Sequence, residues 1–160
     1  MWDLTYALPE EIGDPDLFVG RKSEMARLLD WAEGTRRRIS KSMGILSRRK
    51  KGKTALLQRF FNVLYTRNDP RLIPFYYRIP EEHLSKTVFA EAFYRRLLTQ
   101  YFGFTLRQPE MVDQVLSFSE LQQLAQDDHP VAADLHRMEE ILQRFPGQAW
   151  GHAREAGHRI

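Results

Sequence analysis

The chain lacks several features that define well-known protein classes. Its 160 residues contain no cysteine, which excludes a disulfide scaffold, a Cys-ligated zinc site and a thiol nucleophile. No apolar run approaches the roughly 18 residues that a membrane span needs. Acidic residues interrupt the first 20 positions, so the start of the chain does not have the pattern of a signal peptide. We therefore expect a soluble, cytoplasmic protein with no membrane partner.

Acidic residues are also missing from one long interval of the sequence. None lies between Glu33 and Asp69, whereas that interval holds eleven Lys and Arg residues. The rest of the chain carries 13 basic and 21 acidic residues, so the net charge of +3 conceals a strongly basic block. Such a block indicates an anionic partner. We expect residues 36–53 to be available to a nucleic acid or to a protein partner.

Hydrophobic residues make up 42% of the chain and aromatic residues 12%, which favours a folded domain. Apolar spacing of three and four residues predicts helices from Phe18 to a stop at Gly34, and over 53–65, 85–102, 118–126 and 130–145. Two apolar runs, 42–47 and 72–79, are predicted to be strands. Residues 1–17 are expected to be an irregular lead-in, and 146–160 a disordered or aberrant tail.

The strongest motif is the tripeptide Gly52-Lys53-Thr54, placed between a predicted strand and a predicted helix. This is the context of a phosphate-binding P-loop, in which backbone amides at a helix start point at phosphate oxygens. Lys53 would reach the β- and γ-phosphates, and the Thr54 hydroxyl would hold Mg²⁺. We therefore expect Mg-ATP to bind here, with Lys53 as the catalytic residue.

The full eight-residue pattern G-x-x-x-x-G-K-[ST] would occupy residues 47–54, and it departs at its first position, where Ser47 replaces glycine. A chance G-K-T on a basic surface loop is the alternative interpretation. The four consecutive cations of the loop repel one another, which an anion would relieve. The predicted phosphate-binding residues are Ser47, Arg48, Arg49, Lys50, Lys51, Gly52, Lys53, Thr54 and Ala55.

A second motif precedes the loop: Phe18, Gly20, Arg21 and Glu24 form the pattern F-x-G-R-x-x-E. This pattern followed by a basic Walker A loop resembles the archaeal-type ATPases, which belong to the STAND branch of AAA+-related P-loop NTPases. The resemblance implies a three-layer α/β fold, with a parallel sheet flanked by helices. It also implies that Phe18, Val19, Gly20 and Arg21 lie against adenine and ribose. From the residues alone, these four also fit a hydrophobic entry to a helix.

One element that such an ATPase needs is missing from the sequence. A Walker B motif is an apolar strand ending in Asp-Glu, and its nearest approximations, residues 88–91 and 131–134, fall in helical patterns. We therefore expect residues 18–145 to be the N-terminal part of a P-loop ATPase domain, incomplete in this chain through truncation or a frame shift. Nucleotide binding without turnover is the predicted function. The alternatives are a basic nucleic-acid-binding fragment and a non-functional remnant, and the sequence leaves oligomerisation open.

Overall fold

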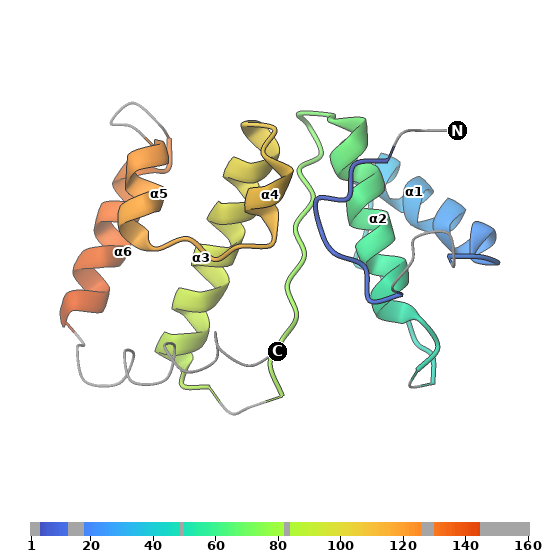
Figure 1. Cartoon of the computed structure of the whole chain (residues 1–160), viewed down its shortest axis with the longest axis horizontal. Helices are drawn as coiled ribbons and strands as arrows, with labels where there is room; N and C mark the ends of the chain where they lie inside the picture. The colour runs from blue at the N-terminus through green and yellow to red at the C-terminus, as the bar shows by residue number, and fades with distance from the viewer. Residues whose placement is uncertain (1–3, 13–17, 49, 82–83, 126–129, 145–160) are drawn as a thin grey trace. The chain divides into compact units, whose positions relative to one another are not determined.

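A computed structural model describes residues 4–12, 18–48, 50–81, 84–125 and 130–144. The elements in these ranges are helices, shown in Figure 1. In chain order they are α1 (Lys22–Arg36), α2 (Lys53–Arg67), α3 (Lys86–Thr105), α4 (Pro109–Val112), α5 (Phe118–Ala125) and α6 (Ala132–Arg144). No helix in the ranges given above has the length and apolar content to cross a membrane.

The predicted three-layer α/β fold is wrong, because the described residues contain no β-strand and therefore no parallel sheet. Residues 42–47 and 72–79, predicted as strands, have no regular secondary structure. An apolar run favours an extended backbone, but a strand also needs a neighbour that completes its ladder of hydrogen bonds. At Tyr76 the backbone is bonded by a side chain instead: its N–H donates to Gln100 Oε1 (2.8 Å), and its carbonyl accepts from Gln100 Nε2 (2.9 Å).

The predicted helices are found with small shifts at their ends. The helix predicted to stop at Gly34 continues to Arg36, and the left-handed residue beyond its end is Arg38, with φ of 59°. Gly34 has a packing role instead, because a Cβ there would collide with the Ser40 hydroxyl. The capping box predicted at the start of α5 is confirmed: Ser117 N–H donates to Glu120 Oε2 (2.7 Å), and Glu120 N–H donates to Ser117 Oγ (3.3 Å). The short helix α4 was not predicted.

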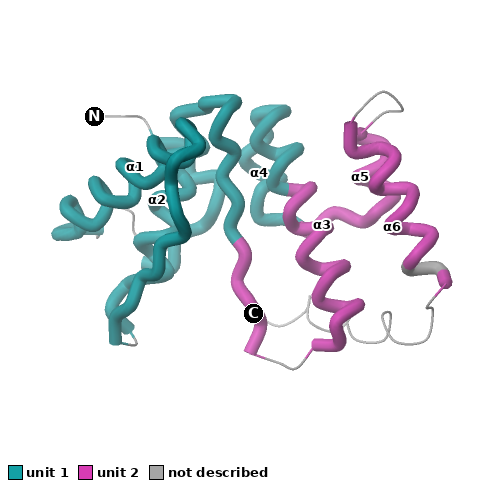
Figure 2. The backbone as a smooth tube through the Cα atoms, turned by 180° about the vertical axis from the view of Figure 1, so that it is seen from behind, with its two compact units in different colours: residues 1–76, 100–114 teal, residues 77–99, 115–160 magenta. Residues whose placement is uncertain are grey.

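The chain forms two compact units, coloured separately in Figure 2. Unit 1 comprises residues 1–76 and 100–114, and unit 2 comprises residues 77–99 and 115–160. In unit 2, α5 packs against α6, and Leu121 and Leu135 are fully buried. The residues of the predicted phosphate loop and of the F-x-G-R motif belong to unit 1. The predicted tail from 146 lies outside the described residues.

Helix α2 is the centre of unit 1 because two of its faces are buried. One face packs against α1 in a cluster of Leu28, Ala32, Leu56, Phe60 and Leu64. The other contributes Phe61 and Tyr65 to a second cluster, which also includes Ala7 and Leu8 from the start of the chain. Fully burying an aliphatic or aromatic side chain of this size contributes about 2 kcal/mol. Packing from two sides thus holds α2, and the loop ahead of it, in a defined position.

Candidate phosphate-binding site

The predicted phosphate-binding residues extend into α2, which begins at Lys53 and has Gly52 as its N-cap. Gly52 has φ of 71° and ψ of 24°, which is the left-handed region that glycine adopts without strain. A Cβ at this position would meet nothing within 4 Å, so the backbone conformation, and not space, favours glycine. Lys50 is also left-handed, with φ of 59°, whereas Ser47 is not among the positive-φ residues. Serine at the first position of the loop therefore brings no left-handed strain.

The Lys53 side chain turns back into the loop that precedes it. Its ammonium group donates to the Ser47 carbonyl (2.9 Å), the Ser47 hydroxyl (3.1 Å) and the Arg48 carbonyl (3.3 Å). These bonds join Lys53 to the first two residues of the predicted loop, Ser47 and Arg48, which lie six and five positions before it in the sequence. The Lys53 ammonium group thus links Ser47 and Arg48 to the start of α2.

The first turn of α2 has donors that the helix itself does not use. Its first intrahelical bond runs from Leu56 N–H to the Gly52 carbonyl (3.0 Å), so the preceding amides have no helical carbonyl to bond. Among the described residues no side chain caps this end, and the first turn carries no acidic residue. The helix dipole adds a partial positive charge. These are the properties of a helix start that accepts an anion.

Most cations of the loop have no anionic partner nearby. Arg48, Lys50 and Lys51 are exposed, and within the described part of the chain no carboxylate forms an ion pair with them or with Lys53. Arg49 lies outside the described residues. Thr54 is half-buried and Ala55 is 6% exposed, so Ala55 contributes packing more than accessible surface.

Arg36 differs from these loop cations although it belongs to the same basic block. Its guanidinium donates to Glu33 (Nε to Oε2, 2.7 Å) and lies 4.0 Å from an Asp69 carboxylate oxygen. The hydrogen bond from Arg36 lowers the pKa of Glu33. Arg36 is therefore paired, whereas Arg48, Lys50, Lys51 and Lys53 form no ion pair with a carboxylate in the described ranges.

Phe18 and Arg21 of the F-x-G-R motif make contacts within unit 1, and Arg21 reaches the predicted loop. The Phe18 ring packs against the α1–α2 cluster, and the Arg59 guanidinium lies 4.6 Å from its centre. Val19 is 77% exposed. Gly20 is left-handed, with φ of 80°. Arg21 donates to Glu24 Oε1 (2.7 Å) and to the Lys51 carbonyl, which joins the motif to the loop.

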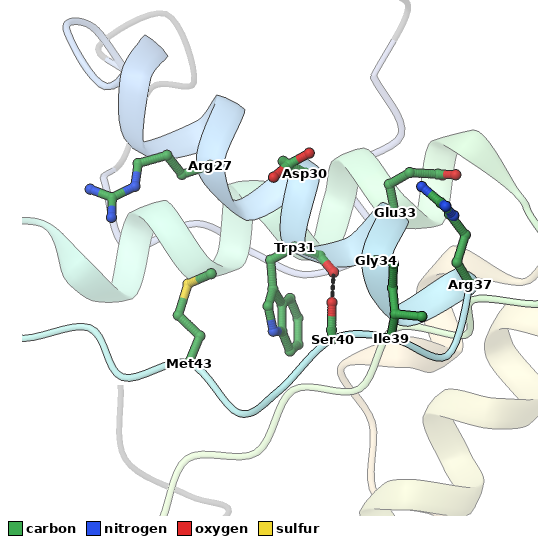
Figure 3. Close-up of a pocket in the computed structure, with 9 residues that line it drawn as sticks. All are labelled: Arg27, Asp30, Trp31, Glu33, Gly34, Arg37, Ile39, Ser40 and Met43. Atoms are coloured by element: carbon green, nitrogen blue, oxygen red, sulfur yellow. Dashed lines mark hydrogen bonds between the residues drawn. The ribbon is translucent and has the colours of Figure 1, made fainter.

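One cavity lies apart from these residues, between α1 and the segment that follows it. Its volume is about 410 Å³, and Figure 3 shows Trp31 under the helix, with Met43 on one side and Ile39 and Ser40 on the other. No sequence pattern indicated this cavity, which lies where the chain turns back after α1 near left-handed Arg38. None of the residues predicted to bind the nucleotide lines it; the lining residues are Arg27, Asp30, Trp31, Glu33, Gly34, Arg37, Ile39, Ser40 and Met43.

The sequence segments most similar to a Walker B motif are mostly helical in the structure. The two nearest approximations to a Walker B motif, 88–91 and 131–134, lie in α3 and at the start of α6. In the ranges that the structure describes, no three His, Asp or Glu side chains come together as a metal site. Comparisons of the chain with models of protein families, with curated proteins and with solved structures found no match.

Proposed function

We propose that residues 47–54 and the first turn of α2 bind the triphosphate of ATP together with Mg²⁺. The observation that carries this proposal is the Lys53 ammonium, folded into a turn that ends in left-handed Gly52 at a helix start. Residues 42–47 do not form the strand that precedes a P-loop, so the proposal rests on the Lys53 contacts and the helix start. The resemblance to archaeal-type ATPases supports ATP as the nucleotide.

The residues present fit a polyphosphate. The first amides of α2, which have no helical carbonyl to bond, donate to phosphate oxygens, and Lys53 exchanges its carbonyl acceptors for phosphate oxygens, which are stronger acceptors because they are charged. The exposed Arg48, Lys50 and Lys51 attract the anion. The Thr54 hydroxyl is the protein ligand proposed for Mg²⁺, whose usual remaining ligands are phosphate oxygens and water. Binding without turnover remains the predicted activity of this chain.

The test is a Mg-ATP titration of the wild type, Lys53→Ala and Lys86→Ala, with a labelled nucleotide. Lys86 is the first residue of α3, as Lys53 is of α2, so its replacement removes the same charge from the same helical position. We expect Lys53→Ala to weaken binding at least about tenfold, the factor that corresponds to about 1.4 kcal/mol, and Lys86→Ala to leave it unchanged. Equal affinities of the wild type and Lys53→Ala would exclude the P-loop.

A nucleic-acid-binding surface is the second candidate, and it is favoured by the exposed cations Arg48, Lys50 and Lys51, which pair with no carboxylate that the structure describes. Attraction to a phosphate backbone falls steeply with salt and depends little on sequence. DNA binding that disappears between low and physiological salt, and that Mg-ATP does not affect, would support this function over nucleotide binding. Competition between Mg-ATP and DNA would instead place both ligands on the loop.

A further inference from the structure

Arg21 connects two segments that are 30 residues apart in the sequence. It precedes the first residue of α1, and its guanidinium donates one hydrogen bond to Glu24 Oε1 (2.7 Å) and another to the Lys51 carbonyl. The resemblance implied that Arg21 contacts the nucleotide itself. In the structure, its planar head instead lies between an acidic side chain of α1 and the backbone of the phosphate loop.

The carbonyl that Arg21 holds belongs to the peptide unit that joins Lys51 to Gly52. A peptide unit is planar and trans, so its carbonyl and its N–H point in opposite directions. A donor that fixes the Lys51 carbonyl therefore also fixes the direction of the Gly52 N–H. That amide lies at the N-terminal end of α2, in the left-handed residue that precedes Lys53.

Glu24 keeps the Arg21 head oriented toward this peptide. The hydrogen bonds from Ser23 and Arg21 lower the pKa of Glu24 to about 2. Its carboxylate therefore stays charged at neutral and mildly acidic pH. The guanidinium has donors in a fixed fork, so one bond to Glu24 sets the direction of the other.

We propose that Arg21 is a positioning residue that orients the Lys51–Gly52 peptide for phosphate binding, and that it does not contact the base or ribose. This inference rests on the proposed function of the loop. It distinguishes two possible roles of Arg21, which predict different binding results for ATP and for a polyphosphate without a nucleoside. A residue that orients the loop affects every polyphosphate equally, whereas one that contacts the nucleoside affects ATP alone.

The experiment compares Mg-ATP with magnesium tripolyphosphate, which has the phosphates without the nucleoside. We expect Arg21→Ala to weaken both ligands by the same factor, about tenfold for the loss of a charge-assisted hydrogen bond. Arg21→Lys should also weaken both, because a single ammonium does not reproduce the planar fork that bridges Glu24 and the carbonyl. Glu24→Gln should weaken both less. Arg27→Ala, which removes the same charge from within α1, should change neither.

A readout without any ligand tests the geometry directly. In the apo protein, we expect the Gly52 amide resonance to shift in Arg21→Ala and Arg21→Lys and to stay in place in Arg27→Ala. Weakened ATP binding with unchanged tripolyphosphate binding would overturn the proposal in favour of nucleoside contact. Unchanged affinities with an unmoved Gly52 amide would also overturn it. A wild type that binds neither ligand would refute the proposed function, while the Gly52 resonance would still decide what Arg21 orients.

Discussion

Two segments of unit 1 without regular secondary structure differ in burial from what their sequences predict. The N-terminal strap, residues 4–12, belongs to a segment predicted to be irregular, yet Ala7 and Leu8 are 3% and 2% exposed. Residues 42–47 are an apolar run predicted to be a buried strand, yet Leu46 is 97% exposed and only Ile45 packs against the α1–α2 cluster. The segment predicted to be an irregular lead-in thus supplies buried side chains, whereas the segment predicted to be a buried strand is mostly exposed.

The difference comes from polar side chains on α2 that bind the strap backbone. Asn62 accepts a hydrogen bond from Leu8 N–H (2.8 Å) and donates to the Leu8 carbonyl (2.9 Å). Gln58 accepts from Glu11 N–H (2.8 Å), and Thr66 accepts from Thr5 N–H (2.9 Å). These three residues of α2 satisfy backbone groups that a sheet would otherwise have to pair. Burial of a segment without regular secondary structure therefore needs hydrogen-bond partners for its backbone as well as apolar side chains.

The largest effect is expected from Asn62, which is completely buried. Asn62→Ala would leave the Leu8 N–H and carbonyl buried without partners, which lowers the free energy of unfolding by about 3 kcal/mol. Urea unfolding of the variant measures this change. Gln123→Ala, on an exposed position of α5, is the control and should have little effect. If the two variants unfold at the same urea concentration, the strap is not held by its backbone bonds.

A smaller effect is expected from the ion pair between the strap and α2. Arg59 Nε lies 2.7 Å from Glu10 Oε1, and the two side chains are 15% and 1% exposed. Glu10→Gln keeps the shape of the side chain but removes the negative charge that balances the mostly buried Arg59 guanidinium. The free energy of unfolding should therefore fall by about 2 kcal/mol. Glu33→Gln removes an exposed pair with Arg36 and should cause no measurable loss. Equal losses in the two variants would contradict the distinction between buried and exposed pairs.

The smallest effects are expected in residues 42–47. Ile45→Ala removes a half-buried side chain from the α1–α2 cluster and should cost about 1 kcal/mol. Leu46→Ala changes a side chain that is almost fully exposed, and the change should stay below about 0.5 kcal/mol. Thermal unfolding of the two variants side by side measures the contrast. A larger loss for Leu46→Ala would mean that this segment is buried in solution.

The helices could be predicted from the sequence because their signals are local. Leu56, Phe60 and Leu64 recur at helical spacing on α2, and Ser117 with Glu120 marks the start of α5. The predicted strands were wrong because a strand depends on a partner that its own sequence does not contain. The strap was underestimated for a similar reason, since its partners Asn62 and Gln58 are polar residues some 50 positions later and have no apolar periodicity.

At the candidate site, the sequence placed Ser47, Gly52 and Lys53 in one motif, and the structure brings them together around the Lys53 ammonium. It did not indicate that Arg59 packs on Phe18 or that Arg21 reaches the Lys51 carbonyl, because both contacts join distant segments. The sequence by itself determined the helices and the basic loop, since periodicity and charge are local properties. Only the tertiary structure decided which extended segment is buried and which group Arg21 holds, since both depend on hydrogen-bond partners that come together only when the chain is folded.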